Sequence, residues 1–203
     1  MPHTLADAKA VIYDTILHRR AGTAPEETPV IFDECTIEKP WGWVFFYNNE
    51  RYFRTRDHRW IWVGPGPIFF HRESGEIREF GSGANLEEEI YDYEMELAAH
   101  DRSWCLWLTA DQDRMKAIVN LKAALAIATQ QAQAMVPALP HCLFAGIRRH
   151  LDWVAQRFAD RGVTTEITLE RAADVAQSVF TFPEQMINPS LAQAYHQRWD
   201  VVT

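Results

Sequence analysis

The sequence has little cysteine and no long hydrophobic run. Its three cysteines, Cys35, Cys105 and Cys142, are odd in number and form no Cys-x-x-Cys pair, which argues against a disulfide framework and a zinc site. The longest apolar runs, such as WGWVFF, are far shorter than a membrane span. The first residues also lack the basic and then apolar pattern of a secretory signal. We therefore expect a cytoplasmic protein with no membrane partner.

Sequence motifs for catalysis are absent as well. There is no Gly-x-Ser-x-Gly, His-Glu-x-x-His, Walker-type loop or Gly-x-Gly-x-x-Gly, and the prolines of GPGP at 64–67 lack the N–H groups that cradle phosphate. The histidines are scattered. The consecutive glutamates of LEEEIYDYE fan around a helix instead of forming a pair of glycosidase carboxylates. We expect a protein that is not an enzyme and that holds no metal or cofactor.

The acidic excess lies entirely in the first half of the chain. Residues 1–100 hold 18 Asp and Glu against 10 Lys and Arg, whereas residues 101–203 hold 10 of each, for a net charge of −8. Binding to nucleic acid or to an anionic membrane needs clustered Lys and Arg, so neither partner is expected. The charge favours a basic protein partner instead.

The first half predicts a helix, an antiparallel sheet and a second helix. Apolar residues recur at helical spacing over residues 4–19, with Thr4 as the N-cap. Extended segments follow, including ERYFRT at 50–55 after a turn at Asn48–Asn49, then an irregular GPGP and a hairpin bent at Ser74–Gly75. Residues 86–100 predict the closing helix.

The second half predicts a strand, three helices and a strand. The apolar strand 103–110 ends at Asp111, a good N-cap, and PALPHCLFAG at 137–146 is interpreted as a connection between the second and third helices. The third helix stops at Gly162, before an alternating strand. The predicted fold class is α+β, with domains at 1–100 and 101–170 (a βαααβ sandwich) and a helical extension at 171–203 that packs on them.

Aromatic residues are concentrated between Phe32 and Phe70. A strand over 41–47 places Trp41, Trp43, Phe45 and Tyr47 on one face, which predicts a core. Trp41, Trp60 and Trp62 lie beside prolines, charged residues and loops, so they are either interface anchors or a seal between the two halves. The twelve aromatic residues are Phe32, Trp41, Trp43, Phe45, Phe46, Tyr47, Tyr52, Phe53, Trp60, Trp62, Phe69 and Phe70.

The first half resembles the YrhB-type immunity-protein family found beside bacterial polymorphic toxins. The resemblance is carried by GWVFFYN at 42–48, GPGPIFFHRESGEI at 64–77 and LEEEIYDYE at 86–94. It implies a binder that forms a one-to-one complex with a protein toxin and covers its active site or substrate surface. Acidic residues would steer a basic toxin and aromatic residues would slow its dissociation. The charge and exposure arguments give these candidate contacts: Trp41, Trp60, Trp62, Glu87, Glu88, Asp92, Glu94 and Glu96.

Residues 103–170 look like the C-terminal domain of the bacterial ribosomal stalk protein and the related ClpS adaptor. The stalk pattern falls on Asp113, Arg114, Met115, Ile118, Leu121 and Lys122, and RFADRGVTTEITLE matches its ending. This resemblance implies that the toxin acts on a translation elongation factor. Two alternatives stay open: a ClpS-like adaptor or regulatory protein without a toxin, and a small-molecule binder that uses the tryptophans as a cage.

Overall fold

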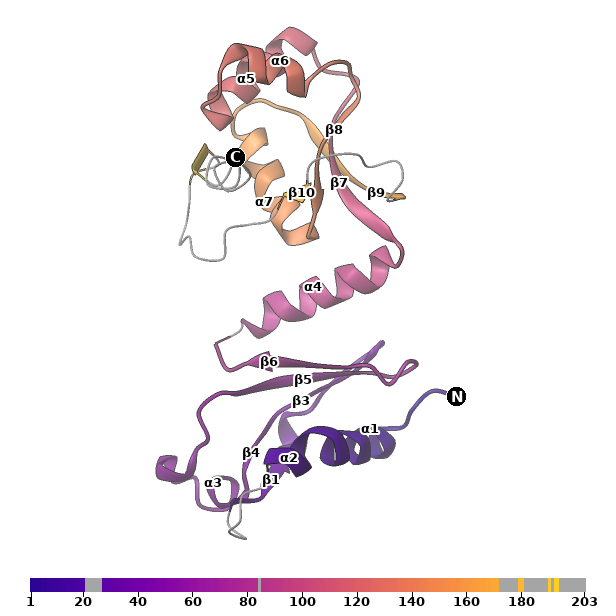
Figure 1. Ribbon diagram of the computed structural model, residues 1–203, viewed down its shortest axis with the longest axis vertical. Helices are drawn as coiled ribbons and strands as arrows, with labels where there is room; N and C mark the ends of the chain where they lie inside the picture. The colour runs from indigo at the N-terminus through magenta and orange to yellow at the C-terminus, as the bar shows by residue number, and fades with distance from the viewer. Residues whose placement is uncertain (21–26, 84, 172–178, 181–189, 191, 194–203) are drawn as a thin grey trace. The chain divides into compact units, whose positions relative to one another are not determined.

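The computed structural model describes residues 1–20, 27–83, 85–171, 179–180, 190 and 192–193. The chain divides into two units, Met1–Glu89 and Ile90–Thr203. This boundary lies within helix α4 (Leu86–Ala99), upstream of the predicted boundary at residue 100. Helices combine with mainly antiparallel sheets, which confirms the α+β class (Figure 1). The predicted extension 171–203 lies almost entirely outside the described residues.

The first unit begins with a continuous helical segment over residues 5–20. It consists of α1 (Leu5–Ile12), the π-helical turn η1 (Tyr13–Leu17) and α2 (His18–Arg20). Thr4 and Asp7 form a capping box: the Thr4 hydroxyl accepts from the Asp7 N–H at 3.2 Å, and the Asp7 carboxylate accepts from the Thr4 N–H at 2.8 Å. The predicted first helix and its N-cap are confirmed.

The helical segment packs on an aromatic sheet. The four-stranded sheet has the order β2-β3-β5-β6, and β1 pairs with β4 in a separate antiparallel ribbon. Their bounds are β1 (Pro29–Ile31), β2 (Ile37–Lys39), β3 (Gly42–Phe45), β4 (Tyr47–Asn49), β5 (Pro65–His71) and β6 (Ile77–Gly81). Figure 1 shows α1 and α2 along one face of this sheet, where Trp43, Phe45 and Phe70 meet Ile12 and Leu17 in one core. The predicted aromatic core is confirmed at these positions.

Two segments of the first unit differ from their predictions. Residues 50–55, predicted as a strand, form α3 (Glu50–Thr55), because the Asn49 side chain caps the helix by accepting from the Arg51 N–H at 2.7 Å. The GPGP segment, predicted as irregular, begins β5 at Pro65. Proline fits there because β6 lies beside β5 from Pro65, whereas β3 pairs only from Ile68, so fewer ladder bonds are required.

The second unit is a sheet with helices packed on it. The sheet order is β10-β8-β7-β9, and its core joins Leu106 and Leu108 to Leu121, Leu151 and Phe158 of the helices. The elements are β7 (Arg102–Leu108), α5 (Arg114–Leu125), α6 (Thr129–Met135), β8 (His141–Gly146), α7 (Arg148–Ala159), β9 (Thr165–Arg171) and β10 (Val179–Phe180). In the described part of the chain, no helix is both long and apolar enough to span a membrane.

The predicted βαααβ order was wrong because the connection at 137–146 contains a strand. β8 pairs with β7 in antiparallel fashion and buries Leu143, Phe144 and Ala145. The six residues HCLFAG are too few for a typical helix, and an apolar run of this length does not reveal by itself whether it pairs. The helix after β7 is capped by Asp113, whose side chain accepts from the Lys116 N–H at 2.7 Å, and not by Asp111.

Replacing Gly42 with alanine is expected to lower the free energy of unfolding of the first unit by about 3 kcal/mol. The added methyl group would overpack a contact with the neighbouring backbone, which can relax only by straining the strand. Gly42 has φ +158°, and a Cβ there would collide with the carbonyl of Phe70 on the neighbouring strand. Denaturant unfolding at 25 °C measures the change. Gly83→Ala is the matched control, because a Cβ at Gly83 meets nothing within 4 Å. Equal stabilities of the two variants would contradict this account.

Candidate functional site

Four consecutive large apolar residues form a loop on the first unit, Trp60, Ile61, Trp62 and Val63, which we call the 60–63 loop. Val63 is 91% exposed and Ile61 is 38% exposed, while Trp60 and Trp62 are half-buried. Single exposed apolar residues are ordinary, but a contiguous exposed group indicates a contact surface. The 60–63 loop is therefore the candidate binding site.

The side chain of Asn48 fixes the second half of this loop. Asn48 is only 8% exposed. Its Oδ1 accepts from the Trp62 N–H at 2.8 Å, and its Nδ2 donates to the Trp62 carbonyl at 3.1 Å. The amide thus satisfies both backbone groups of Trp62, as a neighbouring strand would. Trp62 is held in place although it lies outside any strand.

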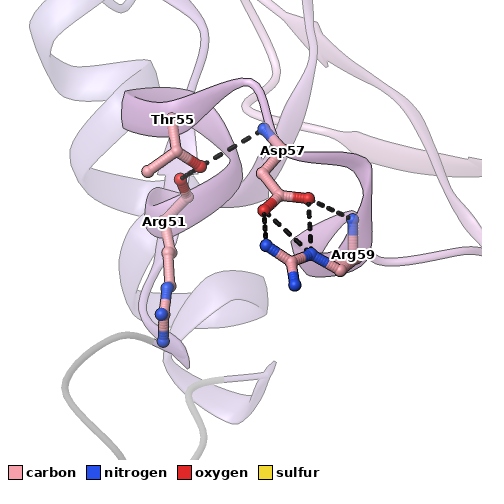
Figure 2. A network of polar contacts seen from close by, with 4 residues as sticks. All are labelled: Arg51, Thr55, Asp57 and Arg59. Atoms are coloured by element: carbon pink, nitrogen blue, oxygen red, sulfur yellow. Dashed lines mark hydrogen bonds and ion pairs between the residues drawn. The ribbon is translucent and has the colours of Figure 1, made fainter.

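A second network fixes the turn that leads into the loop (Figure 2). The Thr55 hydroxyl donates to the Arg51 carbonyl at 2.7 Å and accepts from the Asp57 N–H at 3.2 Å. The Asp57 carboxylate accepts from the Arg59 backbone N–H at 3.0 Å and from the Arg59 guanidinium at distances down to 2.6 Å. These bonds build the short helix η4 (His58–Trp60), with Asp57 as its N-cap.

Arginine side chains stack on the aromatic residues at the base of the loop. The Arg51 guanidinium lies 3.5 Å from the centroid of the Trp60 ring, and that of Arg56 lies 5.1 Å from the Phe53 ring. Phe53 in turn stacks on Phe32 with centroids 5.0 Å apart. Such cation–π contacts hold aromatic side chains in one orientation. The 60–63 loop therefore rests on a layer of stacked arginine and aromatic side chains.

The structure brings Trp60 and Trp62 together but places Trp41 elsewhere. Gly42, next to Trp41, pairs with His71 at the end of β5, whereas the 60–63 loop precedes Pro65 at its beginning. Seven residues of strand separate these two points by about 20 Å. Trp41 is half-buried, with its ring 5.4 Å from that of Phe69. One compact surface cannot include all three tryptophans as neighbours.

The five predicted acidic contacts are divided between the two units. Glu87 and Glu88 are exposed in the first turn of α4, where the Asn85 side chain accepts from the Glu87 N–H at 3.1 Å. Asp92 accepts from the guanidinium of Arg149 at 2.8 Å, within the second unit. Glu94 is half-buried and Glu96 is exposed. Asp92 therefore forms an ion pair with Arg149. Glu87, Glu88 and Glu96 expose their side chains, and the Glu88 carboxylate also accepts from the Asn85 side chain at 3.4 Å.

The second unit contains a cavity of about 420 Å³ between α4, the start of β7 and the start of α7. Its wall includes Met95, Trp104 and Ile147, and the Trp104 indole N–H donates to the Met95 carbonyl at 3.0 Å.

The Tyr91 hydroxyl donates to Asp152 at 2.8 Å. Burial and this carboxylate raise the pKa of Tyr91. The sequence hypothesis of a tryptophan cage did not include Trp104.

The described residues form neither a reactive-cysteine site nor a metal-binding cluster. Burial raises the pKa of Cys105 to about 12 and also raises that of Cys142, so both thiols are poor nucleophiles at neutral pH. Cys35 is exposed. Within those same ranges, no group of three or more His, Cys, Asp or Glu side chains is placed to hold a metal ion.

Ile61 and Val63 were not among the predicted contacts. The sequence signal was present, since WIWV stands between charged residues and a Gly-Pro segment. However, a short continuous apolar run of this kind is equally typical of a buried strand. The role of Asn48 had no local signal, because its partner Trp62 is fourteen residues away.

Asn48→Ala is expected to cost about 2 kcal/mol of stability, because two backbone groups of Trp62 lose their buried partner. Hydrogen exchange of the Trp62 amide should accelerate, while that of Phe69 in β5 should change no more than global stability requires. An unchanged Trp62 exchange rate relative to Phe69 would show that the amide does not hold the loop.

The turn before the loop should loosen only in strong acid. Hydrogen bonds from Arg59 lower the pKa of Asp57 from 3.8 to about 2. Because the folded-state pKa is lowered, the stabilisation is fully present above pH 3.8 and is lost as the pH falls through about 2. An NMR titration of the Arg59 side-chain N–H should therefore show a midpoint near 2, absent in Asp57→Asn. A titration midpoint near the ordinary carboxylate pKa would contradict a stabilising Asp57–Arg59 interaction.

The match to a known family lies almost entirely within the first unit. The family described as Immunity protein 35 matches residues 14–92, a range that contains the 60–63 loop. The uncharacterized protein YrhB of Escherichia coli (strain K12) is 33% identical over 57 residues, which are 28% of this chain and 61% of that protein. No solved structure matches the chain. The resemblance to immunity proteins is thus confirmed over the N-terminal region, and residues 14–92 match the immunity protein 35 family.

Proposed function

We propose that this protein is an immunity protein, which binds a cognate bacterial toxin and covers its active site or substrate-binding surface. The observation that carries the proposal is the family match over residues 14–92. The mode of action is inhibition by binding, without a chemical step on the toxin. The complex contains one copy of each protein, and its place is the cytoplasm of the cell that makes the toxin.

A preformed apolar surface supports this function. Binding energy in protein complexes comes mainly from a few residues, among which Trp and Arg are enriched. The 60–63 loop offers two tryptophans on a base that Asn48, Asp57 and the stacked arginines already order. Ordering before binding lowers the entropy lost on association, so more of the contact energy appears as affinity.

Long-range charge supports a basic toxin. The chain has a net charge of −8, and all of the excess lies in residues 1–100. Glu87, Glu88 and Glu96 expose their side chains, as does much of the acidic first half. Such a field raises the association rate of a basic partner and weakens as salt is added. Asp92, Glu94 and Trp41 remain in the proposed contact set as secondary positions.

A more specific proposal concerns the class of toxin. It rests on the sequence pattern that residues 113–122 share with the ribosomal stalk domain, since β8 interrupts the expected βαααβ order. We propose that the toxin acts on a translation elongation factor, whose binding partner this segment imitates. In that case, elongation factor and immunity protein compete for the toxin in a pull-down. Unchanged toxin affinity in the presence of saturating elongation factor would overturn this part alone.

The test is co-expression with the protein encoded immediately upstream of this gene. We expect a one-to-one complex by gel filtration and light scattering, and rescue of growth when the toxin is induced. An immunity protein from an unrelated toxin pair is the control for specificity. No complex and no rescue would contradict the proposal and would favour the ClpS-like adaptor, which requires no toxin.

A further inference from the structure

The segment that carries the candidate site has a charge opposite to that of its surroundings. Residues 50–63 contain four arginines, Arg51, Arg54, Arg56 and Arg59, but only two carboxylates, Glu50 and Asp57. The rest of the first half is strongly acidic. The most apolar exposed part of the first unit is therefore also its most basic part.

Three of these guanidinium groups remain accessible although each has an ion-pair partner. Arg54 pairs with Glu50 at 2.7 Å, Arg56 with Glu34 at 3.2 Å and Arg59 with Asp57 at 2.6 Å. Their side chains are 72%, 59% and 84% exposed, respectively. A guanidinium carries five N–H donors, so one carboxylate leaves several for an external acceptor. The ion pairs therefore orient these guanidinium groups and leave N–H donors available to a partner.

Two of these arginines, Arg51 and Arg59, lie next to the apolar loop. Arg59 immediately precedes Trp60, and the Arg51 guanidinium covers one face of the Trp60 ring at 3.5 Å. Arg54 lies about one turn further along α3, and Figure 2 shows Arg51 on α3 and Arg59 on the short helix η4 that follows it. Aliphatic Ile61 and Val63 stand next in sequence, with Val63 almost fully exposed. The exposed apolar loop thus lies beside a cationic stretch of the chain.

We infer that the 60–63 loop enters an apolar pocket of the toxin whose edge carries carboxylates. This inference rests on the proposed function and names the contact chemistry of its site. Bidentate Arg–carboxylate pairs are strong and directional, and they suit the edge of an apolar contact. The basic character of the toxin as a whole governs the encounter, whereas this local patch of opposite sign fixes the bound orientation.

A nucleic-acid contact fits the same residues less well. Phosphate binding needs clustered cations with few competing anions, but Glu34, Glu50 and Asp57 are interleaved with these arginines. Stacking on bases uses open aromatic faces, and one face of Trp60 is covered by Arg51. The fully exposed group is the aliphatic Val63. An apolar protein pocket accounts for it, whereas a phosphate backbone does not.

The apolar part of the inference is tested by calorimetry with the purified toxin. Ile61→Ser and Val63→Asp should each weaken binding at least about 30-fold, the loss typical of a hot-spot residue. The matched control is Leu5→Ser, since Leu5 is 39% exposed and Ile61 is 38% exposed in the same unit. Because all three positions are exposed, thermal unfolding should be nearly unchanged, which excludes misfolding as the cause.

The charge part is tested with Arg54→Gln, whose control is the exposed Arg19→Gln on the first helix. We expect Arg54→Gln to weaken binding about tenfold, which is about 1.4 kcal/mol, and Arg19→Gln to leave it unchanged. If wild-type protein binds and protects while these loop and Arg54 variants bind as tightly as their controls, the inference fails and the function stands. If wild-type protein binds no toxin, the function itself fails. Tight binding of a single-stranded RNA 20-mer that Val63→Asp abolishes would also overturn the inference.

Discussion

The paired hydrogen bonds between the Asn48 side chain and the Trp62 backbone are the constraint on which the candidate surface depends. Asn48 belongs to β4, so it ties the loop directly to the ribbon that β4 forms with β1. A hydrophobic loop without such a tie would fold back and bury its apolar groups. With both backbone polar groups of Trp62 satisfied, the side chains at 61 and 63 can remain exposed.

The first unit uses its aromatic residues for two different purposes. On β3 and β5, Trp43, Phe45 and Phe70 fill the space beneath the first helix and stabilise the fold. At the loop, Trp60 is braced by Arg51 and stays accessible. The same residue type therefore supports a rigid scaffold and a surface that the scaffold presents, which is the arrangement expected of a binding protein.

Local signals in the sequence predicted the first helix, the Ser74–Gly75 hairpin and the aromatic core, because capping residues, glycine and alternation act over a few positions. Strand β8 was missed because its existence depends on pairing with β7, more than thirty residues away. The helix α3 was missed because Asn49, interpreted as a turn residue, caps a helix. Trp41, Trp60 and Trp62 were predicted together as candidate contacts, and the separation of Trp41 from the other two follows only from the register of β3 on β5.

The three thiols differ in accessibility, so that one of them, in the first unit, can be labelled selectively. Cys35 is exposed in η3 (Asp33–Cys35), directly after Glu34, the ion-pair partner of Arg56. Cys105 is buried and Cys142 is half-buried, and both hold their protons tightly. A maleimide dye would thus attach selectively to one position beside the arginine-stacked base of the loop. The natural sequence already carries an attachment point from which a partner's arrival at this surface can be followed by fluorescence.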